Sequence, residues 1–406
     1  STRSAAEARP APPTPTKPTL HYHLRVVIDP EQHNLRVVAA IRSARPRSRF
    51  FLNPALAIES IEVGGKSVRC DRSGDAIDLA EPASRLDIRY QGVLTPELSP
   101  NDSKGKAYVE PGRVRLTEVT LWYPVFYDGP EAFPWPPEPV EARLELPAVD
   151  GLSWVTSGKA VTPVEFVVDE PGDLSVVGLP GAPLRVADPS GTVALTVLGV
   201  RGDALVERVV DVVRRHASRL GRLRDKSLSL VSFPDEAVTK PLGFLSSRLV
   251  VFNTPMSRRL AENGPEAVWT LAHELGHLWF GAELRASGPA ALWLSEGFAE
   301  YFSWLVLRDL FGDDGYTTRE QRARERSDGT RARLDALAAG DQRVYTIGAL
   351  ALHDLALRVG PGRLEAAIRD IHSARRPWTT DSFFAAIIAK GAAREDVAAF
   401  RSEWGA

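Results

Sequence analysis

Five consecutive residues, His273-Glu274-Leu275-Gly276-His277, combine two imidazoles and a carboxylate at a spacing that can hold and use a metal ion. Residues four apart lie on the same face of a helix, so His273 and His277 could bind one zinc ion together. Glu274 would project beside that metal, where its carboxylate could take a proton from an attacking water. Two histidines on an ordinary surface helix would show the same spacing, so the hydrolytic interpretation requires a further ligand.

The chain offers a third ligand shortly after the second histidine. Catalytic zinc takes three protein ligands and leaves a fourth position open for water. Glu296 follows His277 after eighteen residues and lies in the apolar, helix-like segment 292–311, where an unpartnered carboxylate is unfavourable. Two antiparallel helices joined by the loop 282–291 would bring Glu296 over both histidines. The sequence therefore predicts a His-His-Glu site that binds about one Zn²⁺ per chain, with Glu274 as general base.

The residues around these positions resemble a known family. His-Glu-x-x-His, eighteen residues and Glu is the spacing of the gluzincin metallopeptidases, the family of aminopeptidase N and leukotriene-A hydrolase. Residues 277–281, His-Leu-Trp-Phe-Gly, are similar to its His-Gln-Trp-Phe-Gly, and 293–299, Trp-Leu-Ser-Glu-Gly-Phe-Ala, to its Trp-Leu-Asn-Glu-Gly-Phe-Ala. Residues 345–349, Tyr-Thr-Ile-Gly-Ala, resemble its Tyr-x-Lys-Gly-Ala. The resemblance implies a zinc peptidase acting on peptide substrates, with Tyr345 donating to the oxyanion of the tetrahedral intermediate.

The chain departs from that family at the strand that binds the substrate. The family carries Gly-Ala-Met-Glu-Asn there, and its Glu binds the free amine of the peptide. The corresponding segment 241–252 has a strand pattern and no carboxylate. Ser295 and Ala282 also replace family asparagines, and Ile347 replaces a lysine. These changes spare the metal and proton chemistry and leave the substrate-binding residues unidentified.

The missing carboxylate bears on the kind of peptide that is cleaved. A buried ammonium without a partner is unfavourable, and Arg248 would repel an ammonium if it pointed inward. The sequence therefore predicts weak activity on amino-acid anilides and no strong need for a free amine. The alternative is that another carboxylate, such as Glu138 or Glu141 near the proline-rich segment, supplies the anchor.

Composition excludes several other classes of protein. The 406 residues are 44% hydrophobic and 25% charged, as in ordinary soluble domains, and the net charge of −2 gives no basic field for binding nucleic acid. Apolar runs such as 192–200 are much shorter than the roughly 20 residues of a membrane helix, so no transmembrane span is expected in this chain. Cys70 is the only cysteine, so no intrachain disulfide can form.

The order of patterns along the chain predicts an α+β protein. Residues 1–19 are rich in proline and are expected to be a disordered tether, typical of an exported protein after a cleaved signal peptide or lipid anchor. Residues 20–190 contain short alternating runs and are predicted to form an all-β, sandwich-like domain. Residues 191–406 are predicted to form a mainly helical, thermolysin-like zinc metallopeptidase domain. The strands expected in the first domain are 22–29, 35–42, 58–63, 76–79, 86–90, 114–121, 140–146 and 161–168.

Two alternative functions share this sequence pattern. The same zinc machinery could serve an endopeptidase or another amide or ester hydrolase. A catalytically retired binding or scaffold protein is disfavoured because ligands, base and tyrosine are all present.

Glu300, one helical turn after Glu296, could orient a zinc-bound histidine or be a solvated helix charge. Five histidines outside this motif are predicted not to be metal ligands: His21, His23, His33, His353 and His372.

Overall fold

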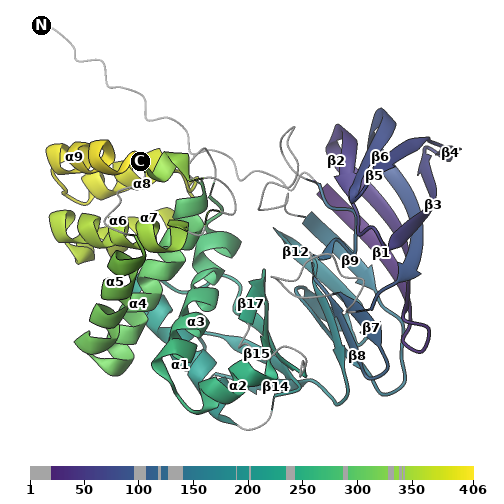
Figure 1. The fold of residues 1–406 in the computed structure, drawn as a ribbon, viewed down its shortest axis with the longest axis horizontal. Coiled ribbons are helices and arrows are strands. Elements are labelled where there is room, and N and C mark those ends of the chain that lie inside the picture. The colour runs from purple at the N-terminus through teal and green to yellow at the C-terminus, as the bar shows by residue number, and fades with distance from the viewer. Residues whose placement is uncertain are drawn as a thin grey trace, which may run out of the picture.

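The computed structural model divides into a β-rich N-terminal half and a mainly helical C-terminal half, which lie side by side (Figure 1). It describes residues 20–95, 107–117, 120–126, 140–188, 190–200, 203–234, 243–286, 291–327, 333–337, 341 and 343–406. The predicted tether at 1–19, the proline-rich residues 127–139 and Glu138 lie outside the described residues. The α+β fold class is confirmed.

The N-terminal half is a sandwich of two sheets. Its strands alternate buried and exposed residues, as in β1, where Leu20, Tyr22 and Leu24 are buried, and this places one face of each strand in the core. One continuous cluster of buried side chains fills the space between the two sheets. The larger, nine-stranded sheet has the order β11 (Lys159–Thr162), β12 (Glu165–Gly172), β9 (Val140–Glu145), β1 (Leu20–Asp29), β2 (Asn34–Phe51), β6 (Ala76–Val93), β3 (Leu56–Val63) and β4 (Lys66–Ser67), with β5 (Cys70–Ser73) paired to β6. The smaller sheet has the order β10 (Ser153–Thr156), β13 (Val176–Leu179), β8 (Arg113–Leu116) and β7 (Tyr108–Glu110).

Several strand predictions differ from the structure. The predicted strand 161–168 spans the turn between β11 and β12, and the predicted strand 35–42 is only part of the longer β2. The segments 76–79 and 86–90, predicted as separate strands, belong to the single strand β6, because the residues between them continue to pair with β2 through irregularities of register. The strand predicted at 114–121 is shorter, since β8 ends at Leu116. Sequence alternation marks where strands run, but it does not show that a bulged partner can keep pairing across polar residues.

The C-terminal half is built on a five-stranded sheet covered by helices. A cluster of buried side chains, including Val155, Val177, Val231 and Val251, packs the four-stranded sheet of the N-terminal half against this sheet. The sheet has the order β14 (Leu184–Ala187), β15 (Ala194–Leu198), β16 (Ser227–Phe233), β18 (Leu249–Asn253) and β17 (Gly243–Ser246), so β17 is an edge strand. The helices are α1 (Asp203–Leu220), α2 (Thr254–Ala261), α3 (Pro265–Gly276), α4 (Phe298–Phe311), α5 (Asp313–Arg326), α6 (Arg343–Val359), α7 (Pro361–Ser373), α8 (Thr380–Ala389) and α9 (Arg394–Trp404), with short helical segments η3 (Leu278–Glu283), η4 (Trp293–Gly297) and η5 (Leu334–Ala336).

The sequence pattern of residues 266–280 predicts one continuous helix, and in the structure this helix ends early. Helix α3 stops at Gly276, and the chain continues as the π-helical segment η3, in which Phe280 and Gly281 leave helical backbone angles. The predicted helix 292–311 likewise begins as the π-helical turn η4 before becoming α4. π-Helical turns occur often at functional sites, and here both lie next to the predicted ligands. Within the part of the chain that is described, no helix is both long and apolar enough to cross a membrane.

Glycines allow the elements around the predicted site to approach closely. A Cβ atom at Gly276 would lie 3.3 Å from the Cα of Ala299, so α3 and α4 are nearly in backbone contact. A Cβ atom at Gly348 would lie 2.8 Å from the Cα of Gly297, which leaves no room for a side chain where α6 crosses η4. The first contact brings the two histidines toward Glu296, and the second brings Tyr345 to the same place.

We expect Gly348→Ala to lower the free energy of unfolding by about 1–3 kcal/mol, because the added methyl group would overpack the crossing of α6 and η4. Gly362→Ala is the matched control, since a Cβ atom at Gly362 meets nothing within 4 Å. Denaturant unfolding of both variants measures the difference. A Gly348→Ala protein as stable as the Gly362→Ala protein would show that the crossing tolerates a side chain.

Candidate metal centre

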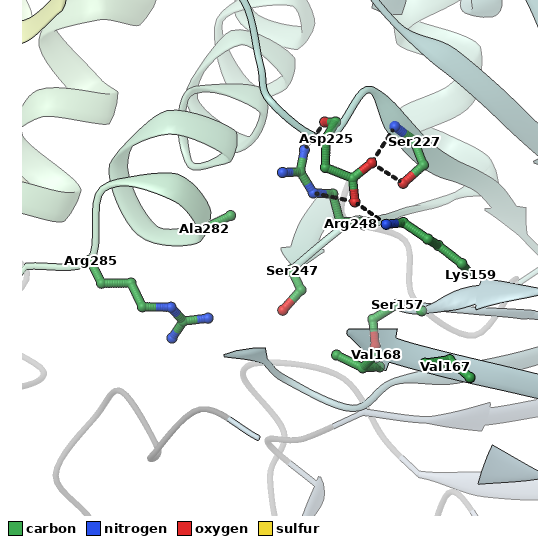
Figure 2. A pocket seen from close by; sticks show the side chains of 11 residues that line it. Ser157, Lys159, Val167, Val168, Asp225, Ser227, Ser247, Arg248, Ala282 and Arg285 are labelled. Carbon is green, nitrogen blue, oxygen red and sulfur yellow. Dashed lines mark hydrogen bonds and ion pairs between the residues drawn. The ribbon is translucent and has the colours of Figure 1, made fainter. Parts of the chain in front are cut away.

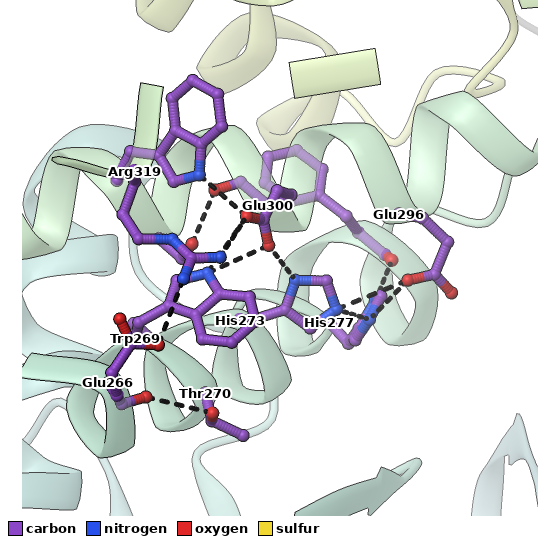
Figure 3. Close-up of polar contacts among 12 residues, drawn as sticks. Glu266, Trp269, Thr270, His273, His277, Glu296, Glu300 and Arg319 are labelled. Carbon is purple, nitrogen blue, oxygen red and sulfur yellow. Dashed lines mark hydrogen bonds and ion pairs between the residues drawn. The ribbon is translucent and has the colours of Figure 1, made fainter. Parts of the chain in front are cut away.

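The three predicted ligands converge in the structure (Figure 3). The Nε2 atoms of His273 and His277 are 3.2 Å apart. The Oε2 atom of Glu296 lies 3.4 Å from Nε2 of His273 and 3.3 Å from Nε2 of His277. Residues of α3 therefore meet a residue of η4, as the two-helix prediction required. Among the described residues, this is the group of histidine, cysteine and acidic side chains that is arranged to hold a metal ion.

The two Nε2 atoms and Oε2 of Glu296 are suited to bind a cation. Nδ1 of His273 lies 3.1 Å from Oε2 of Glu300, and Nδ1 of His277 lies 3.2 Å from the carbonyl oxygen of Phe280. If both Nδ1 atoms donate to these acceptors, both Nε2 atoms present lone pairs to one another. Oε2 of Glu296 is buried without a hydrogen-bond partner. Tetrahedral zinc with ligands at about 2.0–2.1 Å holds them about 3.3–3.4 Å apart, which is the spacing found here.

The electrostatics of the site also favour a positive charge. Burial disfavours the imidazolium form of His273, but the carboxylates of Glu296 and Glu300 outweigh burial and raise its pKa to about 10. Burial works against the charged form of Glu296 as well, yet His277 and His273 hold its pKa far below the usual range. Both shifts show that the carboxylates favour a positive charge at this position, which a bound cation would supply.

Glu274 lies beside the three ligands in a position suited to a general base. Its Oε2 atom accepts a hydrogen bond of 3.2 Å from the backbone N–H of Leu245 in β17. Burial raises the pKa of Glu274, and the nearby histidines oppose that shift. The edge strand thus orients one carboxylate oxygen and leaves the other to contact a water.

Tyr345 approaches the same centre from α6. Its ring centroid lies 5.5 Å from that of His273. Burial, followed by the carboxylates of Glu296 and Glu274, raises the pKa of Tyr345 well above its usual value. A phenol in this environment stays protonated, so its hydroxyl can donate a hydrogen bond to a developing anion.

Glu300 faces His273 rather than solvent. Its side chain is 5% exposed, and its carboxylate accepts from Nδ1 of His273 at 3.1 Å and from the indole of Trp304 at 2.8 Å. The indole of Trp269 donates to both oxygens, at 3.0 and 3.1 Å, and Arg319 donates at 3.3 Å. Of the two interpretations of Glu300, the structure supports contact with the ligand histidine. Metal-binding histidines often donate their second ring N–H to such a carboxylate.

Sequence reasoning missed the residues that surround Glu300, although part of the signal was present. Trp269 precedes His273 by four residues, and Trp304 follows Glu300 by four, so each lies on the same helical face as its neighbour. Arg319 comes from α5, and no spacing relates it to the site. Its contact could only emerge from the packing of the helices.

The tip of the β17–β18 hairpin lies within 241–252, the segment that corresponds in sequence to the family's substrate-binding strand. Ser246 is fully buried there and its hydroxyl lies 2.8 Å from that of Ser175, from the N-terminal half. The neighbouring Ser247 accepts a hydrogen bond of 2.6 Å from the backbone N–H of Asp173. The N-terminal half therefore holds the strand that contacts Glu274, and the hairpin tip itself carries no acidic side chain.

Arg248 is turned away from the metal centre, so the predicted repulsion of an ammonium does not arise. Its guanidinium donates to Glu283 at 2.9 Å and to the backbone oxygen of Asp225 at 2.6 Å. Figure 2 shows it on the Asp225 side of a pocket lined also by Lys159 and Arg285. Buried Glu283 also accepts a hydrogen bond from His372.

Of the remaining predicted positions, Glu141 lies apart from the centre and Ser295 lies beside it. Glu141 lies on the outer face of the large sheet, where an oxygen atom is 3.1 Å from Nδ1 of His21. Ser295, in place of the family's asparagine, donates at 2.9 Å to the carbonyl of Phe280, the acceptor that also faces His277. Ser295 thus contributes to the position of a ligand.

Comparison with known proteins also indicates a metallopeptidase domain. Residues 240–373 match the Peptidase family M1 domain. Aminopeptidase M1-B of Oryza sativa subsp. japonica is 34% identical over 113 residues, which cover 27% of this chain and 12% of that protein. Aminopeptidase N of Mus musculus is 23% identical over 224 residues, 52% of this chain and 22% of that protein. The chain thus matches less than a quarter of the length of either relative.

Solved structures share the fold over nearly the whole chain. An M1 zinc metallopeptidase from Deinococcus radiodurans, a mutant bound to the substrate Tyr-Ser-Ala, has a TM-score of 0.68 and 20% identity, with 95% of this chain and 94% of that chain covered. A two-domain M1 zinc metallopeptidase mutant bound to L-tryptophan has a TM-score of 0.66 and 20% identity over 95% and 94% of the two chains. The N-terminal β domain and helical second domain are therefore a known combination.

We expect the purified protein to contain about one zinc per chain and Glu296→Ala to lose most of it, because three ligands would fall to two. Elemental analysis after dialysis measures both. Glu325→Ala, which removes an exposed carboxylate on α5, is the control and should retain zinc. A wild-type protein that neither contains zinc nor takes it up on reconstitution would favour the scaffold alternative.

Proposed function

This chain belongs to peptidase family M1, and on that premise we propose that it is a zinc-dependent aminopeptidase that cleaves peptides with Glu274 as general base. The observation that carries the proposal is the convergence of three acceptor atoms within 3.4 Å of one another. Such a group is unfavourable without a cation, and Glu274 and Tyr345 lie directly beside it. The relatives named aminopeptidases support the activity.

Each residue has a defined task in hydrolysis. Zinc, when bound, supplies a Lewis acid that lowers the pKa of a water to about 7 and polarises the scissile carbonyl. Glu274, oriented by Leu245, accepts the proton of the attacking water and returns it to the leaving amine. Tyr345, kept protonated by its surroundings, donates to the oxyanion. Glu300 and the carbonyl of Phe280 hold the two imidazoles in place.

The edge of the five-stranded sheet supports binding of an extended peptide. Among the described strands, β17 pairs with β18 alone, and a strand edge without a neighbouring strand can form main-chain hydrogen bonds with a substrate. Leu245 of the same strand contacts Glu274. A peptide laid along this edge would therefore bring its backbone close to the general base without needing a particular side chain.

We expect Glu274→Gln to keep its zinc and lose nearly all turnover, since an amide cannot accept the proton. Tyr345→Phe should keep its zinc and lose about 10²-fold or more in kcat, by analogy with the removal of one oxyanion donor. Steady-state kinetics with elemental analysis measure both. Tyr316→Phe is a matched control, because its hydroxyl lies 2.6 Å from His353 rather than at the metal centre. Full activity of Tyr345→Phe would remove that residue from the mechanism.

A second candidate function is an endopeptidase that accepts blocked or internal peptides, and the absence of a carboxylate from segment 241–252, where the family carries its amine-binding Glu, favours it. This is the outcome expected from the sequence, whereas the relatives support dependence on a free amine. The two proposals differ in a single measurable property, the response to acetylation of the substrate's N-terminus.

We expect a peptide with a free N-terminus to be cut from that end and its acetylated form to be cut about tenfold more slowly or worse, because a hydrogen bond to a charged group contributes about 1.5–3 kcal/mol. Mass spectrometry of the products gives the cut positions. Amidation of the C-terminus is the control and should leave the rate unchanged. Equal cleavage of both forms at internal bonds would replace the aminopeptidase proposal by the endopeptidase.

A further inference from the structure

Helix α5 has an unusual way of docking onto the catalytic half. Helices usually dock through an apolar stripe. The side chains that α5 buries fully are Arg319 and Ala323, and its other residues are mainly charged or polar. A charged residue is thus the main buried contact of this helix, and burying it is favourable only if partners compensate the charge.

The partners of Arg319 are two carboxylates and an indole ring. One terminal nitrogen lies 3.3 Å from Oε1 of Glu300, and the other lies 3.3 Å from Oε2 of Glu266. The guanidinium carbon lies 3.5 Å from the ring centroid of Trp269. Figure 3 shows the guanidinium of Arg319 between Glu266 and Glu300, on the opposite side of Glu300 from His277. Arg319 is therefore the cationic neighbour of the carboxylate that faces His273.

The arrangement links α5 to the metal centre through one carboxylate. Oε1 of Glu300 accepts from Arg319 and Trp304, while Oε2 accepts from His273, and Trp269 donates to both oxygens. Donors on both sides leave the carboxylate one orientation. That orientation directs Nδ1 of His273 to Glu300 and Nε2 to the metal position.

We propose that Arg319 is a positioning residue for the metal, and that docking of α5 through Arg319 controls how long zinc stays bound. The inference rests on the proposed zinc site. Without Arg319, Glu300 would be a buried carboxylate without a cation and would turn away from His273. His273 would then be free to rotate, and a ligand with several orientations releases its metal faster.

The same helix supplies a matched control. Arg322 lies three residues after Arg319 and also forms an ion pair with Glu266. Its side chain is 43% exposed, against 6% for Arg319, and none of its contacts reaches Glu300. Arg319→Met and Arg322→Met are therefore the same chemical change on the same helix, and only the first alters the surroundings of His273.

The experiment measures transfer of zinc from the loaded protein to a colorimetric chelator. We expect release from Arg319→Met to be about 10–100-fold faster than from wild type, the range found when partners of metal ligands are removed. Arg322→Met should release zinc at the wild-type rate. Arg319→Lys should be intermediate, because it restores the charge without the planar fork. The cobalt-substituted Arg319→Met protein should show altered visible absorption bands, which a change confined to helix docking would not produce.

Wild-type release from Arg319→Met would overturn the inference, and so would equal acceleration by Arg322→Met, since any loosening of α5 would then suffice. If Arg319→Met does not fold, Arg319→Lys takes its place, since it removes the planar fork at the same position, and its release of zinc at the wild-type rate would be equally contrary. A wild-type protein that binds no zinc would instead contradict the proposed function. The two failures are therefore distinguishable.

Discussion

Three hydrogen-bond acceptors that meet in a buried site impose the constraint on which the rest of the catalytic half depends. The nitrogen atoms of His273 and His277 and an oxygen of Glu296 lie 3.2–3.4 Å apart, and such a group is unfavourable unless a cation lies between them. To bring them together, α3 and α4 must approach almost to backbone contact at Gly276 and Ala299. The functional site therefore coincides with one of the close helix contacts of this half.

The two halves of the chain meet beside Glu274, the proposed general base. Leu245 of β17 donates to Glu274, and the next residue, Ser246, lies against Ser175 of the N-terminal half. From the other side, buried Glu283 binds Arg248 of the same hairpin. An edge strand held from both sides can keep a carboxylate in one orientation, although edge strands are otherwise prone to pair elsewhere. The β domain thus contributes to catalysis by supporting a strand.

Glu300 illustrates why the surroundings of a metal site are harder to predict than its ligands. Both indoles that bind it lie four residues from a site residue along a helix, and helical spacing could have identified them. Arg319 lies on another helix, and its sequence neighbours are charged residues of a surface face. Only the packing of α5 against α3 and α4 makes its guanidinium part of the centre.

The sequence by itself identified the residues that meet at the site, through the spacing of His273, His277 and Glu296 and, for Tyr345, through a family resemblance. It also indicated the order of a β half and a helical half, because helical periodicity and strand alternation are local properties. It did not determine that α3 ends at Gly276, or that β6 runs unbroken from Ala76 to Val93. Nor did it show that Arg248 turns toward Glu283 and that Ser246 rests on Ser175. These features depend on partners far away in the chain, and a side chain's direction follows from the packing that encloses it rather than from its neighbours in sequence.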